Sequence, residues 1–199
     1  MAKDDEQTAP DAWQILESDE LYRNPYFVFR RDTCALPNAR IMPAYYVWEL
    51  VDWVNVVALT LDNRLILVNQ YRHAAGKRFY EFPGGTTEPE SAENPETAAR
   101  RELLEETGYA PGRLQYLGMH YPNPGLQDNR LHVYLATECQ RVSEQKLDTF
   151  EDIVVELVDP QQLLLVIEQG YPMHSLMMAS LTLALPAIKR LYSNSFAAI

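Results

Sequence analysis

Three glutamates close together in the sequence offer the oxygen ligands of a divalent cation. On a helix of 3.6 residues per turn, Glu102, Glu105 and Glu106 fall on one side. Like charges at such spacings destabilise a helix by about 0.2–0.5 kcal/mol per pair, and a bound cation would reverse the sign of that interaction. Carboxylate oxygens are the ligands that Mg²⁺ and Mn²⁺ prefer. Taken alone, this spacing is more often a solvated acidic face than a metal-binding one, because charged runs usually face water; the complete pattern around it decides for the metal site.

Local signals predict the helix that positions these glutamates. Asn94 can cap its start, and Pro95 suits the first helical position. Gly108 suits the left-handed residue that commonly ends a helix. Leu103 and Leu104 point away from the acidic side, so we expect both to pack against a sheet.

Runs of β-branched and aromatic residues, bounded by turn residues, predict the sheet itself. The expected strands are Val54–Leu61, Leu65–Tyr71, Phe79–Phe82, Leu114–Met119, Leu131–Ala136 and Ile153–Val158. Two C-terminal helices are expected, one from Asp159-Pro160 to near Gly170, and one from about His174 to Tyr192 with a bend at Pro186. This pattern predicts an α+β fold, an α/β/α sandwich in which helices flank a mixed sheet. Antiparallel strands rich in Tyr, Phe, Val and Trp precede it.

Composition bounds the class of protein. The 199 residues suit a flexible tail at 1–12, an N-terminal β region at 13–53 and a larger domain at 54–199. The net charge of −11 argues against nucleic acid or an anionic membrane as partner, although bound cations can invert the sign of a local site. Cys34 and Cys139 provide neither a zinc spacing nor a disulfide framework. With no apolar stretch long enough to span a bilayer, we expect a cytoplasmic protein.

The segment Gly85 to Tyr109 resembles the Nudix box, G-x5-E-x7-R-E-U-x-E-E-x-G-U, where U is bulky and apolar. Every fixed element from Glu93 to Tyr109 is present at the family spacing. Between Gly85 and Glu93, seven residues replace five. A loop lengthened by two residues costs only tenths of a kcal/mol, so the helix should form as in the family.

The resemblance implies both a chemistry and a set of roles. The family hydrolyses a nucleoside diphosphate linked to another moiety, using Mg²⁺ or Mn²⁺. Carried over by position, Glu102 and Glu106 are the main metal ligands, and Glu105 is a further ligand or a water-mediated contact. Gly84 would offer its backbone carbonyl to a metal, and Arg101 would orient the glutamates.

Further motifs resemble the ADP-ribose pyrophosphatase branch of the family, over roughly Trp13 to the C-terminal helix. These are Leu36-Pro37-Asn38, Gln70-Tyr71-Arg72, Glu81-Phe82-Pro83-Gly84-Gly85 and Asn123-Pro124-Gly125-Leu126. Pro124 stands sixteen residues beyond Gly108, where a proline marks this branch. Two positions depart from the branch: Gly84, where it commonly has Ala, and Asn129, where a glutamate is expected.

The branch takes its general base from a glutamate on a loop after the box. The matching loop lies between Gln140 and Asp152, and Glu151 is the best match. Asp152 and Glu144 are substitutes for that role, and a solvated loop acid is the alternative interpretation. Proton transfer by such a base typically contributes about 10²–10⁴-fold to the rate.

Other residues are candidates for binding the substrate. Arg72 can bond phosphate oxygens with both ends of its guanidinium. Trp48 can stack on a base, as can Trp53, Tyr45 and Tyr46, although strand aromatics more often serve a core or an interface. Pro124 is a further candidate for binding the substrate, because it belongs to the motif that marks the branch. The histidines His73, His120, His132 and His174 are interpreted as structural.

The sequence thus predicts a Mg²⁺-dependent hydrolase of ADP-ribose, or a similar nucleotide sugar, that yields AMP and a sugar phosphate. Alternative substrates are GDP-mannose, NADH and dinucleoside polyphosphates. A catalytically silent Nudix domain that binds a nucleotide and regulates a partner is an alternative of another class, and a purely structural acidic domain is a third. In the branch, N-terminal strands commonly build a homodimer, which we also expect here.

Overall fold

The computed structural model describes residues 11–88, 91, 93–171 and 173–191. The chain forms two compact units, one comprising residues up to Val51 with Asn123–Asn129, and one comprising Asp52–Pro122 with the residues from Arg130 onward. The segment Asn123–Asn129 thus falls in the first unit, whereas the sequence-based division placed it in the larger domain. The tail expected at 1–12 lies outside the described residues, except for its last two positions.

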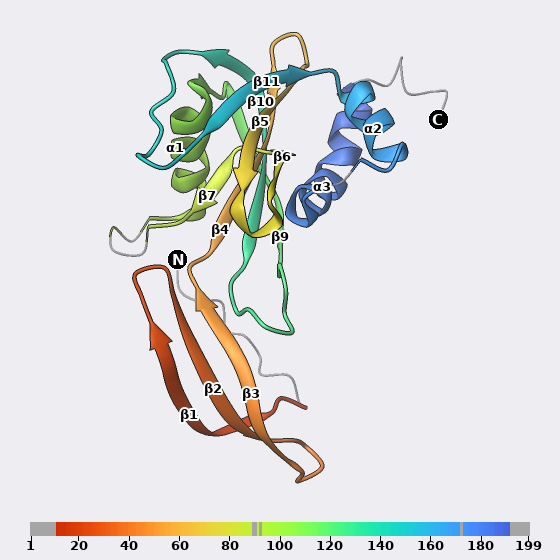
Figure 1. Ribbon diagram of the computed structural model, residues 1–199. Helices are drawn as coiled ribbons and strands as arrows, with labels where there is room; N and C mark the ends of the chain where they lie inside the picture. Colours follow the sequence, from red (N-terminus) through yellow and green to blue (C-terminus); the bar gives the residue numbers. More distant parts are fainter. Residues whose placement is uncertain (1–10, 89–90, 92, 172, 192–199) are drawn as a thin grey trace. The chain divides into compact units, whose positions relative to one another are not determined.

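The first unit is a three-stranded antiparallel sheet, as the N-terminal composition predicted. Its strands are β1 (Gln14–Arg23), β2 (Phe27–Ala35) and β3 (Ile41–Leu50), in that order across the sheet (Figure 1). The ring of Trp48 stacks on that of Phe27, with centroids 5.4 Å apart. The backbone N–H of Trp48 donates to the Leu126 carbonyl at 2.8 Å, so β3 holds the segment Asn123–Asn129 within this unit.

The second unit is built on an eight-stranded mixed sheet of order β11-β5-β4-β10-β8, with β6, β7 and β9 paired to β5, β4 and β10. Its strands are β4 (Trp53–Thr60), β5 (Leu65–Arg72), β6 (Lys77–Glu81), β7 (Gly84–Thr86), β8 (Tyr109–Ala110), β9 (Arg113–His120), β10 (Leu131–Arg141) and β11 (Ile153–Val158). Central strands β4 and β10 run parallel. Both faces are covered there, which explains the almost uninterrupted apolar residues of β4.

Helices cover both faces of this sheet, which confirms the α/β/α sandwich (Figure 1). On one face α1 (Pro95–Thr107) buries Leu103 against Val56 and Ile66. On the other, α2 (Pro160–Glu168) and α3 (Ser175–Leu191) form a larger apolar cluster with β4, β5 and β10. No helix in the described part of the chain combines the length and the apolar character needed to cross a membrane.

The helix α1 begins and ends where local chemistry predicts. The Asn94 side chain accepts a hydrogen bond from the Thr97 N–H at 2.9 Å. At the other end, Gly108 adopts φ = 76° and donates its N–H to the Leu104 carbonyl at 2.8 Å. The expectation that both leucines pack on the sheet is wrong: Leu103 is fully buried, but Leu104 is 37% exposed. Successive residues lie 100° apart on a helix, so only one of the two can face the sheet.

Boundaries elsewhere shift by a few residues. Strand β10 extends to Arg141, beyond the predicted Ala136. The helix α3 begins at Ser175, one residue after the predicted His174, and continues through Pro186. Its expected last residue, Tyr192, lies outside the described residues.

Candidate active site

A cavity of about 850 Å³ opens in the second unit, between α1, strands β4 to β7, the loop before β11 and the start of α3. Acidic side chains outnumber basic ones along its wall. The charged lining residues are Arg72, Glu81, Glu88, Arg101, Glu102, Glu105, Glu106, Lys146, Asp148 and Glu151. All three glutamates singled out on α1 therefore line the same cavity as Glu151, the residue matched to the general base.

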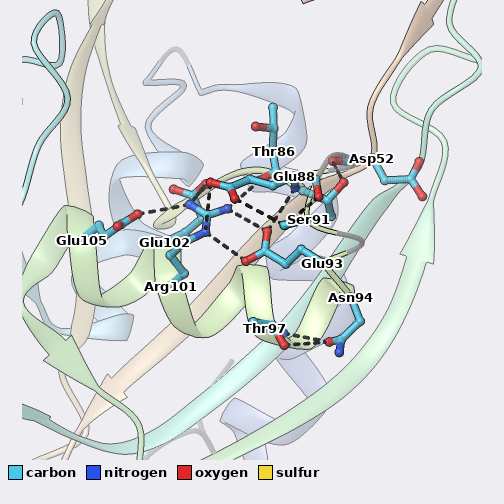
Figure 2. Close-up of polar contacts among 11 residues, drawn as sticks. Asp52, Thr86, Glu88, Ser91, Glu93, Asn94, Thr97, Arg101, Glu102 and Glu105 are labelled. Carbon is cyan, nitrogen blue, oxygen red and sulfur yellow. Dashed lines mark hydrogen bonds and ion pairs between the residues drawn. The ribbon is translucent and has the colours of Figure 1, made fainter.

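Arg101 lies at the centre of the acidic cluster, as Figure 2 shows. Its guanidinium donates to both carboxylate oxygens of Glu93 at 3.0 Å, to Glu102 at 2.9 Å and to Glu105 at 3.2 Å. Nη2 also donates to the Thr86 carbonyl at 2.9 Å. The longer loop before Glu93 thus still delivers this glutamate to Arg101. The bonds join the end of β7 to the middle of α1 and fix the orientation of the carboxylates.

Two of the carboxylates are buried, which makes their charge costly. The Glu102 side chain is 12% exposed, and burial raises its pKa to about 7 against the opposing effect of Arg101. Burial also raises the pKa of Glu106 well above its usual range. The Gly84 N–H, which donates to Glu106 Oε2 at 2.8 Å, opposes this shift, while the charges of Glu102 and Glu151 add to it.

Two glycines allow β7 to pass directly against these carboxylates. A Cβ at Gly85 would collide with the carboxylate of Glu102. A Cβ at Gly84 would collide with the backbone carbonyl of Val54 on β4. The departure at Gly84 from the alanine common in the branch therefore has a physical reason in this chain: there is no space for a methyl group.

The donor set fits a divalent cation. Carboxylates of Glu102, Glu105 and Glu106 line one cavity, and burial disfavours the charge on two of them, which a cation would offset. Among the described residues, no three acidic, histidine or cysteine side chains are already arranged as metal ligands.

The loop between β10 and β11 is tied to the end of α1. The Gln145 side chain donates to the Glu106 carbonyl at 2.6 Å and to the Ile153 carbonyl at 3.3 Å. The Lys146 N–H donates to the Glu105 carbonyl at 2.8 Å. These donors satisfy carbonyls that a helix C-terminus leaves without intrahelical partners, and they hold the loop beside the cavity.

Of the three acids considered for the general base, one lines the cavity. That residue is Glu151, whose carboxylate also accepts the Asp148 N–H at 2.9 Å. Asp152 instead pairs with Arg78 at 2.6 Å, and Glu144 pairs with Arg141 on the surface. Neither belongs to the cavity wall.

Arg72, the candidate for binding phosphate, lines the cavity in a fixed orientation. Its Nε donates to Glu81 at 2.8 Å, and its Nη2 donates to the other oxygen of the same carboxylate. Glu81 is 7% exposed, so it is a well-shielded partner. The paired guanidinium retains further N–H groups for a ligand.

Several residues of the sequence analysis lie in the first unit, among them Trp48, Pro124 and Asn129. Trp48 is engaged with Phe27 there, and Pro124 is exposed. The cavity described above is lined by residues of the second unit alone, so the substrate-binding roles of Trp48 and Pro124 stay predictions. Asn129 is 1% exposed, and its side chain donates to the Val51 carbonyl at 3.2 Å.

Sequence reasoning missed several residues of the cavity. Lys146, which lines the cavity, and Gln145, which holds the same loop on α1, gave no signal, because their contacts with α1 span some forty positions and follow no short motif. His174, interpreted as structural, lines the cavity at the start of α3. Its position just before a helix was the available signal, since polar side chains there commonly accept backbone N–H groups.

Comparison with known proteins identifies the family of this chain. A sequence model of the NUDIX domain matches residues 51–180, well over half of the chain. The chain belongs to the Nudix family. The matched range contains the whole of α1 with its glutamates, the loop carrying Glu151 and the start of α3.

Individual relatives of this Nudix chain carry different substrate names. An ADP-ribose pyrophosphatase of Bacillus subtilis (strain 168) is 39% identical over 106 residues, which cover 53% of this chain and 56% of the relative. The chain thus matches little more than half the length of that protein. A GDP-mannose pyrophosphatase of Enterobacter sp. (strain 638) is 28% identical over 164 residues, covering 76% of this chain and 84% of the relative.

A solved structure, described as the crystal structure of an ADP compounds hydrolase, has the same fold. The TM-score is 0.77 over 90% of this chain and 96% of that chain, at 20% sequence identity. At this identity the match concerns the fold, a mixed sheet between helices. It agrees with the sandwich predicted from the sequence.

Proposed function

We propose that this Nudix protein hydrolyses the pyrophosphate bond of a nucleoside diphosphate sugar, and that ADP-ribose is its main substrate. The observation that carries the proposal is one cavity in which Arg101 gathers the box glutamates while Glu151 lines the same wall. The relative named as an ADP-ribose pyrophosphatase supports the choice of substrate. The products would be AMP and ribose 5-phosphate.

Glu102, Glu105, Glu106 and the Gly84 carbonyl would hold the metal, for which we propose Mg²⁺ or Mn²⁺. Such a cation neutralises phosphate charge, activates water and stabilises the leaving oxygen in an in-line displacement. Arg101 keeps the carboxylates oriented through the bonds given above. Burial raises the pKa of both Glu102 and Glu106, and a bound cation would favour their ionised forms.

Glu151 would accept the proton of the attacking water, and Arg72 would donate hydrogen bonds to a phosphate oxygen. Water oxygen bonds to one phosphorus, and the bond from that phosphorus to the bridging oxygen breaks. The ion pair with Glu81 holds Arg72 in one orientation, so less side-chain entropy is lost when phosphate binds. The Gln145 side chain donates hydrogen bonds to a carbonyl near the end of α1 and to one at the start of β11, and these bonds keep Glu151 near the glutamates.

A panel of nucleoside diphosphate derivatives tests the proposal. The protein is incubated with Mg²⁺ and ADP-ribose, GDP-mannose, NADH or a dinucleoside polyphosphate, and phosphatase then releases phosphate from monoester products only. We expect the highest kcat/KM with ADP-ribose, and no release in EDTA. A panel without turnover, measured beside clear ligand binding, would leave a nucleotide-binding regulator as the better interpretation.

GDP-mannose is the second candidate substrate. It is favoured by the relative named as a GDP-mannose pyrophosphatase, which is aligned over a larger share of this chain than the ADP-ribose pyrophosphatase. The two substrates share the pyrophosphate and differ in both base and sugar. A higher kcat/KM for GDP-mannose in the same panel would replace ADP-ribose in the proposal.

We also propose that the first unit forms a homodimer interface. Large apolar side chains are exposed on its sheet and in the adjoining residues: Trp13, Ile15, Leu16, Leu21, Tyr22, Tyr26, Ile41, Tyr46 and Trp48. An apolar surface of this kind commonly marks an interaction site. Light scattering after size-exclusion chromatography should give twice the monomer mass of 22.9 kDa. A mass that stays at the monomer value at micromolar concentration contradicts it.

A further inference from the structure

The cavity has a second part with a different chemistry from the acidic cluster. Here the wall is formed by Gln70 of β5, Phe79 of β6 and His174, which directly precedes α3. Ala74, Ala75, Met173 and Leu176 complete the wall with small or apolar side chains. We call this part, defined by Gln70, Phe79 and His174, the aromatic end. The metal and water chemistry proposed above assigns no role to it.

Strand register makes the aromatic end continuous with the phosphate-binding residues. Gln70 and Phe79 are directly paired across β5 and β6, so their side chains project to the same face. Arg72 and Glu81 share that face, each two residues away from this pair along its own strand. Because β5 and β6 run antiparallel, Arg72 and Glu81 lie on opposite sides of the pair Gln70 and Phe79, and the hydrogen bonds between them span it. A molecule whose phosphate reaches Arg72 would place its next group against the aromatic end.

The hydrogen bonds of His174 determine what it offers to a ligand. Its Nδ1 accepts the Leu176 N–H at 3.2 Å, so in the neutral ring the proton resides on Nε2. The ring meets that of Phe79 edge to face, with centroids 6.1 Å apart and planes at 84°. Packing and capping thus hold the imidazole in place, with Nε2–H as a donor. The Gln70 side chain, on the same wall, ends in an amide that has both a donor and an acceptor.

We propose that the aromatic end binds the sugar attached to the second phosphate, a polyhydroxyl group, and determines which sugar is accepted. The proposal rests on the proposed function, because that function places the pyrophosphate at Arg72 and the glutamates. A sugar has an apolar C–H surface for Phe79 and hydroxyls for Gln70 and His174, and each hydroxyl both donates and accepts. A purine base is the other organic group of the substrate. The two rings stand at 84° and leave no parallel pair of faces between which a base could stack.

Kinetics with paired substrates test this assignment. ADP-ribose against ADP-glucose keeps the base and changes the sugar with its point of attachment, and ADP-ribose against IDP-ribose changes only the base. For His174→Asn, we expect KM for ADP-ribose to rise about 3–10-fold, the usual effect of one lost hydrogen bond, with kcat within about twofold. The preference between the two sugars should shrink by a similar factor, and the preference between the two bases should not change.

Control variants separate recognition from folding. Asparagine at position 174 can still accept the Leu176 N–H and cap α3, but cannot place a donor where Nε2 lies. A melting temperature within a few degrees of wild type shows that the cap survives. Phe79→Leu is the second test, with the same expected loss of sugar preference. His73→Asn, an exposed histidine that does not line the cavity, should leave all kinetic constants unchanged.

Each outcome decides the proposal. A change in base preference instead of sugar preference assigns the aromatic end to the base and overturns it, and unchanged preferences in both variants also overturn it. If wild type turns over none of the three substrates, the proposed function fails, and ligand-observed NMR titrations with ribose 5-phosphate and AMP decide instead. Weaker binding of ribose 5-phosphate alone in His174→Asn supports a sugar site. Equal binding by both proteins refutes it.

Discussion

The burial of Glu102 predicts an unusual dependence of stability on pH in the metal-free protein. Its side chain is 12% exposed, and its pKa in the folded protein is raised to about 7 from the usual 4.5. The folded state therefore binds this proton more tightly than the unfolded state. The stability that results is fully present below pH 4.5 and is lost as the pH rises through 7. Glu102→Gln removes the titrating group.

The magnitude follows from the pKa shift. A shift of one unit corresponds to about 1.36 kcal/mol, so between pH 5 and pH 8 the wild type should lose roughly 2–3 kcal/mol of unfolding free energy relative to Glu102→Gln. The variant also lowers the pKa of Glu106, because the Glu102 charge contributes to raising it. This coupling acts in the same direction. In the Glu102→Gln variant, Arg101 loses one carboxylate partner. This loss changes the unfolding free energy in addition to the pH-dependent difference.

Urea denaturation followed by circular dichroism in EDTA, at several pH values, measures the difference between the two proteins. Glu96→Gln is the matched control on the same helix, because Glu96 is largely exposed and pairs with Arg100. Its difference from wild type should vary by less than about 0.5 kcal/mol over the same range. At pH 8, Mg²⁺ should stabilise wild type more than Glu102→Gln. A stability difference that is flat with pH, or that favours wild type increasingly as pH rises, refutes the reasoning.

Three further predictions concern activity. Glu106→Gln should nearly abolish turnover of ADP-ribose while the melting temperature in EDTA is kept or raised; wild-type turnover would remove this residue from the metal site. Glu151→Gln should lower kcat by about 10²–10⁴-fold with little change in KM, and a full rate would move the base elsewhere. Gly84→Ala should destabilise the protein by about 1–3 kcal/mol in chemical denaturation and lower kcat, because the methyl group meets the Val54 carbonyl; unchanged stability would show that β7 adapts.

Much of the fold could be predicted because its signals are local. Residues adjacent in sequence set the bounds of α1, since Asn94 and Gly108 act on backbone groups within one turn. The nearly continuous apolar run in the sequence of β4 is typical of a strand that is covered on both faces. Local signals could not predict which of two adjacent leucines is buried. Leu103 and Leu104 are equally apolar, but the helix period allows only one of them to face the sheet.

The candidate site also contains some residues that the sequence could identify and others that required the structure. The box glutamates and Arg101 were found from spacing, because a helix converts spacing into a shared side. The sequence ranked Glu151 before Asp152 and Glu144 as the general base, from its position on the loop. Only the structure shows that Asp152 and Glu144 pair with Arg78 and Arg141, and where the loop is held on α1.

The sequence by itself determined the family, the helix with its acidic face and the sandwich of helices around a mixed sheet, because caps, periodicity and motif spacing act over a few residues. Tertiary structure decided which surfaces share a cavity. Pairing of β5 with β6 sets Phe79 on the same face as Arg72, and the turn before α3 brings His174 onto the same wall. Residues almost a hundred positions apart meet there because sheet register and helix packing fix their distance, which no local pattern encodes.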